Sequence, residues 1–175
     1  VVEMERSTIT ERSSKLFPFS GIYSASKNLI DFEKNKKIED QVKLVSAFWE
    51  TVGQNMDQWK GVRTGNQSAT EVRRDYIHTH VIILQAIGVA GKDLINQFPS
   101  NWKTKLKNLY KVNWLKNDPE WHRRVIINGR VVKNTNSIIL ASNLIKKALG
   151  VRLNTKEKAL ESKIKKNGKL KEISF

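Results

Sequence analysis

The 175-residue chain contains no cysteine, and the absence of thiols excludes several kinds of chemistry. It has no disulfide, no thiolate nucleophile, and no zinc or iron–sulfur centre with cysteine ligands. Long apolar runs are also missing, because no stretch approaches the roughly 18 to 20 residues that a membrane span needs. We therefore expect a soluble protein of the reducing cytoplasm that does not contact a membrane. Because the chain starts at Val1, we also expect it to be part of a longer or processed protein.

Acidic residues are scarce compared with basic ones. The chain has 32 Lys and Arg against 17 Asp and Glu, which gives a formal net charge of +15. Such an excess favours a negatively charged partner, of which nucleic acid is the commonest, with anionic lipid and an acidic protein as alternatives. Residues 144–175 contain ten basic and three acidic residues, so nearly half of the excess lies in this C-terminal segment.

Recognisable catalytic motifs are absent as well. The sequence has no phosphate-binding glycine loop, no dinucleotide-binding fingerprint, no nucleophile elbow and no carboxylate cluster with metal-ligand spacing. Only three histidines occur, and His78 and His80, two residues apart, would point to different faces of a helix, so we expect structural roles for them. We predict no metal and no cofactor. Whether the protein is an enzyme stays open, because another part of a longer protein could complete an active site.

Helical periodicity dominates the chain and predicts about six helices. The expected spans are 19–32 after Pro18, 38–52, a long helix from Ser68 or Thr70 to Pro99, 102–110, 138–149 ended by Gly150, and a last helix capped by Thr155. Segments 34–37 and 61–65 are expected breaks, and residues 112–124 are expected to be irregular. Gly88 and Gly91 lie inside the long helix, where each costs about 1 kcal/mol relative to alanine. We interpret them as sites of close helix approach or of a kink.

One short stretch predicts strands. Residues 125–127 and 131–132 flank Asn128-Gly129, the dipeptide that best suits a type I′ hairpin turn. Since an isolated hairpin is marginal in water, we expect it to pack against the helices under Trp114 and Trp121. The predicted fold is mainly α: a single helical domain over residues 1–175, of about six helices with one small β-hairpin and a basic C-terminal helix and tail over about 154–175.

The loop after this hairpin, "GRVVKNTNS", is the first candidate binding site. Arg130 and Lys133 supply positive charge, Asn136 is one of several neutral donors, and Ser137 or Asn136 is the expected cap of the next helix, 138–149. Free N–H groups at a helix N-terminus, together with basic side chains, bind phosphate oxygens. The alternative is that a polar, basic linker merely joins a hairpin to a helix.

Further basic residues could extend that surface. Arg73 and Arg74 occur near the start of the expected long helix, where the helix dipole favours acidic residues, so they suggest an external anion. Ion pairs with Glu71 or Asp75 are the alternative. The predicted DNA-binding set comprises Arg73, Arg74, Arg123, Arg124, Arg130, Lys133, Asn136, Lys146 and Lys147.

Three segments also carry a resemblance to a known family: "TITERSSKLFPFSGIYSASKNLI", "EVRRDYIHTHVIILQAIGVAGKDLI" and "WLKNDPEWHRRVIINGRVVKNTNSIILASNLIKKALGVRLNTKEKALE". Together they resemble the C-terminal half of DndB-type proteins of the DGQHR-domain family, over residues 8–161. The naming DGQHR motif does not occur in this chain. The resemblance implies a bacterial protein of a DNA phosphorothioation and defence system, with DNA binding and transcription regulation as its role.

The combined expectation is a DNA-binding component or regulator of that system. Its basic surface would contact the backbone of double-stranded DNA, which positions a protein without reading sequence. Other proteins of the modification system are further expected partners. Two alternatives stay open: a module that docks an acidic protein of the modification complex, and part of an enzyme whose active site lies in an N-terminal portion.

Overall fold

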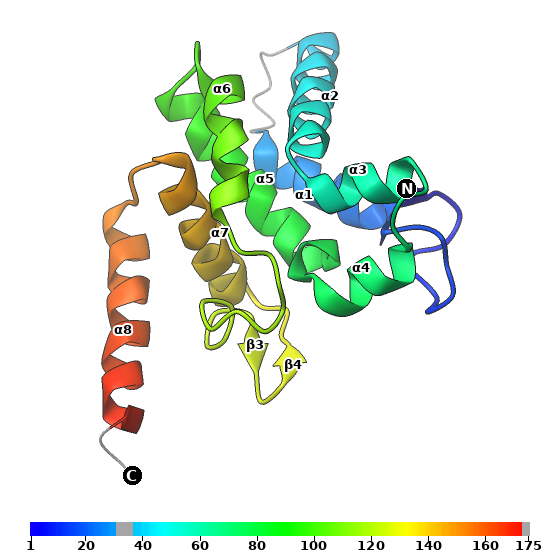
Figure 1. Ribbon diagram of the computed structural model, residues 1–175. Helices are drawn as coiled ribbons and strands as arrows, with labels where there is room; N and C mark the ends of the chain where they lie inside the picture. Colours follow the sequence, from blue (N-terminus) through cyan, green and yellow to red (C-terminus); the bar gives the residue numbers. More distant parts are fainter. Residues whose placement is uncertain (31–36, 173–175) are drawn as a thin grey trace.

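The computed structural model describes residues 1–30 and 37–172, with side chains as far as residue 164. This part of the chain holds eight α-helices, two short 3₁₀ helices and two two-stranded sheets (Figure 1). The α-helices are α1 Phe19–Leu29, α2 Ile38–Gln54, α3 Asp57–Arg63, α4 Ala69–Asp75, α5 Val81–Gln97, α6 Trp102–Leu106, α7 Thr135–Leu149 and α8 Thr155–Glu172. The mainly helical fold is confirmed, whereas the expected number of six helices is wrong.

Helix α5 is the central element and packs between α1 and α7. Its two internal glycines lie where neighbouring groups come closest. A Cβ atom on Gly88 would lie 2.2 Å from the carbonyl oxygen of Ala25 in α1, and one on Gly91 would lie 2.3 Å from Cζ of Phe48 in α2. The interpretation of these glycines as sites of close approach is therefore confirmed.

The long helix expected over 68–99 is wrong, because it divides into α4, the 3₁₀ helix Ile77–Thr79 and α5. Tyr76 and His80 have extended backbones and separate the three pieces. Tyr76 forms a β-bridge with Leu115, and the N–H of Ile77 donates to the carbonyl oxygen of Trp114 at 2.9 Å. This tertiary pairing replaces the helical hydrogen bonds at the break, so the chain turns sharply there.

Other boundaries also differ from the predictions. Helix α3 was not expected and continues into segment 61–65, which was expected to be a loop. The helix expected over 102–110 is α6 followed by the 3₁₀ helix Lys107–Lys111. The first helix ends at Leu29; the rest of its expected span, including Phe32, and residues 34–36 of the expected break lie outside the described residues. A parallel pair, β1 Val2–Glu3 with β2 Phe17–Pro18, was not predicted.

The predicted hairpin is present, with β3 Ile126–Ile127 antiparallel to β4 Arg130–Val131. Asn128 and Gly129 have φ values of 51° and 73°, which are the positive angles that a type I′ turn requires. The hairpin adjoins the stacked, buried rings of Trp114 and Trp121, whose centroids lie 5.7 Å apart.

Asparagines cap the last two helices. The Asn134 side chain accepts from the N–H of Ser137 at 2.8 Å, so α7 starts one residue before Asn136, and the expected caps at Asn136 or Ser137 are wrong. At α8, Asn154 rather than Thr155 accepts from the N–H of Glu157 at 3.0 Å, and Glu157 accepts in return from the N–H of Asn154 at 2.9 Å. Gly150 ends α7 in the left-handed conformation, as expected.

Ion pairs join the start of α8 to the rest of the molecule. Glu161 accepts from Arg124 Nη1 at 2.5 Å and also from Lys147. Glu157 accepts from Lys146 Nζ at 2.5 Å, and Lys146 is fully buried. The two carboxylates of α8 thus pair with three cations, Arg124, Lys146 and Lys147. These pairs allow α8, whose sequence is otherwise basic, to pack against a part of the protein that is also basic.

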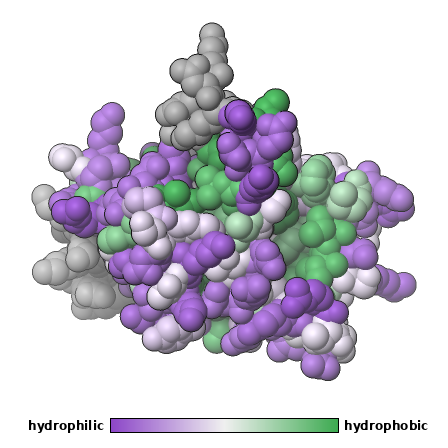
Figure 2. Space-filling model, turned by 90° about the horizontal axis from the view of Figure 1, so that it is seen from above, coloured by the Kyte–Doolittle hydropathy of each residue, from purple (hydrophilic) through white to green (hydrophobic). Residues whose placement is uncertain are grey.

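Helix α2 lies at the opposite end of the molecule from the hairpin (Figure 1). It contributes Phe48 and Val52 to the core, while Ile38 and Val42 are 74% and 58% exposed. Figure 2, which views the molecule from above, shows apolar groups at the surface among hydrophilic ones. Among the described helices, none combines the length and apolar character that crossing a membrane requires.

We expect Gly88→Ala to destabilise the protein. The added methyl group would overlap a backbone oxygen of α1, and overpacking of this kind costs about 1–3 kcal/mol. This cost exceeds the gain in helix propensity of up to about 1 kcal/mol. Gly53→Ala in α2 is the matched control, since a Cβ atom there meets nothing within 4 Å, and it should leave stability equal or higher. Urea unfolding followed by circular dichroism measures both, and equal stability of the two variants would contradict the close crossing.

We expect Glu161→Gln to lower stability at neutral pH by about 1–3 kcal/mol, because it weakens hydrogen bonds between charged groups. Burial raises the pKa of Glu161, but Arg124 and Lys147 outweigh it and hold the pKa below its ordinary value of 4.5. The stabilisation is therefore complete above pH 4.5 and is lost as the pH falls through the lowered pKa. The difference between variant and parent should shrink in acid. Glu50→Gln, on the exposed surface of α2, should match the parent throughout; a difference at Glu161 that does not vary with pH would count against the ion pair.

Candidate nucleic-acid interface

An open pocket of about 980 Å³ lies between the hairpin, the start of α5 and the irregular segment before Trp121. Its charged lining consists of Lys116, Arg130 and Lys133, and it includes no carboxylate. Three cations that line one concave surface attract an anion more strongly than separate surface charges do. The pocket is therefore the strongest candidate for an anion-binding site in the described part of the chain.

The hairpin positions two of these cations. Arg130 begins β4 directly after the turn, and Lys133 follows that strand. The N–H of Val132 donates to the carbonyl oxygen of Val125 at 2.8 Å, which extends the pairing toward Lys133. The Asn128-Gly129 turn thus sets the register that places both side chains at the pocket.

Lys116 reaches the pocket from the segment that pairs with the break before α5. Its N–H donates to the carbonyl oxygen of Asp75 at 2.9 Å, and its ammonium donates to the carbonyl oxygen of Arg73 at 2.6 Å. Burial lowers the pKa of Lys116, and the charge of Asp75 opposes part of this shift. A bound anion would stabilise the charged ammonium in this partly desolvated position.

None of the three pocket cations forms an ion pair with another described residue. An ammonium has three donors, and at Lys116 one of them has a hydrogen-bond partner among the described residues. Arg130 and Lys133 are exposed at the edge of the pocket. The site therefore offers several unsatisfied N–H donors to the oxygens of a ligand.

Two histidines also line the pocket, His80 and His122. Burial, with a smaller effect of Lys116, lowers the pKa of His80 to about 4, so its ring is neutral at pH 7. His78 is different, because it lies in the core and accepts from Trp59 Nε1 at 3.1 Å. The two members of the "HTH" sequence thus have separate surroundings: His78 is structural, and His80 faces the pocket.

The helix N-terminus beside the pocket is that of α5, not that of α7 as expected. Val81 and Ile82, the first residues of α5, belong to the pocket lining. The N-terminus of α7 is capped by Asn134, and Asn136 is exposed in its first turn. Arg130 and Lys133 therefore share the pocket with the first residues of a helix from a distant part of the sequence.

Arg73 and Arg74 have partners within the protein. The Arg73 guanidinium donates to four carbonyl oxygens of the N-terminal segment, including that of Ser13 at 2.7 Å. Arg74 forms a two-pronged pair with Asp75, at 2.7 and 2.9 Å. Arg74 therefore forms the ion pair with Asp75 that was the alternative to an external anion. Arg73 instead holds the segment from Thr10 to Lys15 through hydrogen bonds to its carbonyl oxygens.

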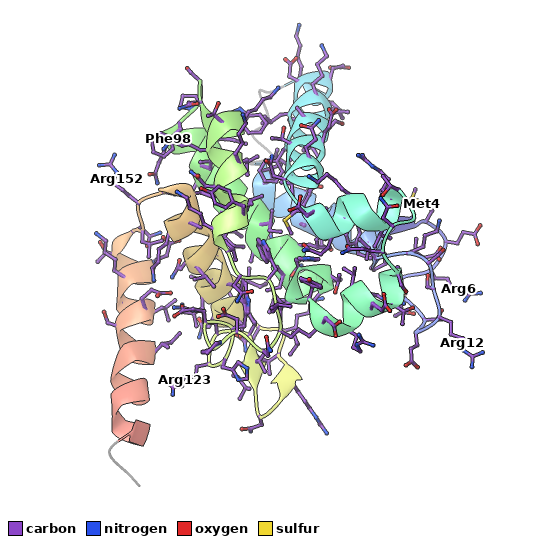
Figure 3. The ribbon with its side chains drawn as sticks, in the orientation of Figure 1. Met4, Arg6, Arg12, Phe98, Arg123 and Arg152 are labelled. Atoms are coloured by element: carbon purple, nitrogen blue, oxygen red, sulfur yellow. The ribbon has the colours of Figure 1, made fainter. Side chains whose placement is uncertain are left out.

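Three more of the predicted residues belong to the ion-pair network under α8. Arg124 and Lys146 are buried, so in this structure neither side chain is available to a duplex. Lys147 is 43% exposed but pairs with Glu161. Arg123 is exposed outside the pocket and points into solvent (Figure 3). The structure therefore brings together only Arg130 and Lys133 of the nine predicted residues in the pocket.

Sequence reasoning missed Lys116, His80 and His122 as lining residues. Lys116 lies in a segment without periodicity, and its position depends on the bridge between Tyr76 and Leu115. No pattern of neighbouring residues marks such a bridge. The "HTH" sequence was noticed, but its two histidines were expected to be on one continuous helix.

Comparison with known proteins gives one match. The model of the family described as "DndB: DNA-sulfur modification-associated" matches residues 1–152. No curated protein and no solved structure matches the chain. The matched range contains the whole pocket and α7 and ends before α8. Because the match covers most of the chain, this protein belongs to the DndB family, which is associated with DNA sulfur modification.

Proposed function

We propose that this protein is a DNA-binding component or regulator of a DNA sulfur-modification system and that it holds the duplex backbone at the pocket. The observation that carries the proposal is that Lys116, Arg130 and Lys133 line one pocket without a carboxylate and form no ion pair with another described residue. Phosphate oxygens fit these donors, and DNA presents them at regular spacing. Membership of a family associated with DNA sulfur modification supports DNA as the source of the phosphates.

Backbone contact fits the pocket better than base reading. Lysine and arginine contacts to phosphates fix the register of a protein on a duplex but carry no sequence information directly. In helix α7, Asn143 and Lys146 are buried against α8. These two polar side chains are therefore committed to the fold, while the hairpin with the exposed Arg130 can approach a duplex.

The resemblance supports finer parts of the same proposal. We infer that the chain corresponds to the C-terminal part of a DGQHR-domain protein of the bacterial cytoplasm, that it acts as a single domain, and that its DNA binding regulates the modification genes. An acidic protein of the modification complex is the competing occupant of the pocket, because its carboxylates would fit the same cations. The salt dependence of binding separates these two partners.

We expect the full chain to bind duplex DNA with an affinity that falls steeply with salt, by a slope of roughly −0.9 per phosphate neutralised. Arg130→Ala combined with Lys133→Ala should weaken binding and reduce that slope by about 1.8. Fluorescence anisotropy at several salt concentrations measures both quantities. The matched control is Lys43→Ala with Lys107→Ala, which removes the same charge from exposed positions on α2 and after α6.

Equal slopes for the pocket variant and the control would show that net charge alone attracts DNA, and the pocket would lose its assigned role. Absence of binding even at low salt would favour the acidic protein partner instead. Circular dichroism of each variant confirms that the fold is intact.

A further inference from the structure

The pocket combines a cationic rim with an aliphatic floor. Arg130 and Lys133 are exposed at the rim, whereas Ile82 and Ile126 are only 2% and 8% exposed. Val81 and Val131 are half-buried and also belong to the lining. A ligand that reaches the floor therefore meets cations with one part of its surface and branched aliphatic side chains with another.

An ordinary phosphodiester suits the cationic part of the pocket better than the aliphatic part. Both of its non-bridging oxygens are strong hydrogen-bond acceptors, and an oxygen placed against Ile82 or Ile126 would lose its water without gaining a donor. Lys116 and the neutral ring of His80 can donate to an oxygen that faces them, but the side chains of Ile82 and Ile126 have no donor. An oxygen that faces these aliphatic side chains is therefore the one left without a donor.

Sulfur in place of one non-bridging oxygen changes this balance. The linkage keeps its negative charge for the cations, while sulfur is a weak hydrogen-bond acceptor and a polarisable atom that packs well against aliphatic groups. Contact between the sulfur and the floor loses little hydration and gains dispersion energy. The remaining oxygen is still available to Lys116 or His80.

We propose that the pocket prefers a phosphorothioate linkage of DNA over an unmodified phosphodiester. This proposal rests on the proposed function, since it names the backbone chemistry that the same site would select. A phosphorothioate phosphorus is chiral, and the cations fix the orientation of the strand at the pocket. One of the two diastereomers therefore places its sulfur on the floor, and that diastereomer binds more tightly.

The test uses the full chain and three short duplexes of one sequence. Their single central linkage is unmodified, the Rp phosphorothioate or the Sp phosphorothioate. Short duplexes are needed because every unmodified phosphate of a longer duplex competes with the single sulfur. We expect one diastereomer to bind at least about fivefold more tightly than the unmodified duplex, because the pocket leaves one fewer acceptor unsatisfied.

Val131→Thr tests the aliphatic lining directly. The hydroxyl adds a donor at a nearly unchanged shape, so the ratio of the phosphorothioate affinity to the unmodified affinity should fall toward one. Val42→Thr makes the same change on α2, where the side chain is 58% exposed, and should keep the parent ratio. Circular dichroism establishes that both variants are folded.

Each outcome decides a different claim. Equal affinity for the three duplexes, combined with weaker binding by the Arg130→Ala and Lys133→Ala variant, would overturn the sulfur preference and leave backbone binding in place. A preference that Val131→Thr does not alter would place sulfur recognition outside this pocket and overturn the proposal as well. Absence of binding to any duplex would overturn both claims together.

Discussion

The close crossing of α1 and α5 is the constraint on which the rest of the structure depends. Gly88 and Gly91 let α5 approach its neighbours so nearly that no side chain fits between them. This crossing fixes the axis of the central helix, and α7 packs against the same helix. Because the first residues of α5 line the pocket, the packing of the core also sets the position of the pocket's floor. A site built on a rigid helix keeps its geometry better than one built on loops alone.

Basic side chains occur in two contrasting environments. Around α8, Arg124, Lys146 and Lys147 are paired with carboxylates in a largely buried network. Such pairs add little net stability, because desolvation offsets their attraction, but breaking one of them is costly. At the pocket, Arg130 and Lys133 have no such partners among the described residues. The cations at the hairpin are therefore available to an external anion, whereas those under α8 already have carboxylate partners.

The hairpin half of the site could be predicted from the sequence, because the Asn128-Gly129 turn is a local signal and fixes where Arg130 lies. The other half could not. Lys116 reaches the pocket through the bridge between Tyr76 and Leu115, two residues far apart in the sequence. The same bridge interrupts the predicted long helix, and apolar periodicity continues through the break since the 3₁₀ helix there is buried. Periodicity reports which residues are buried but not whether the backbone between them is continuous.

Arg73 contributes to the pocket indirectly, through its contacts within the protein and not through contact with a ligand. Its guanidinium gathers the carbonyl groups of the N-terminal segment, while its own carbonyl oxygen accepts from the Lys116 ammonium. The residue therefore lies between two parts of the molecule: its side chain orders one, and its backbone holds a cation of the pocket. An arginine near a helix end suggested an anion, and the partners found are backbone carbonyls that carry only partial negative charge. The cations of the pocket, in contrast, form no ion pair with another described residue. A bound anion would therefore supply the negative charge that neutralises them.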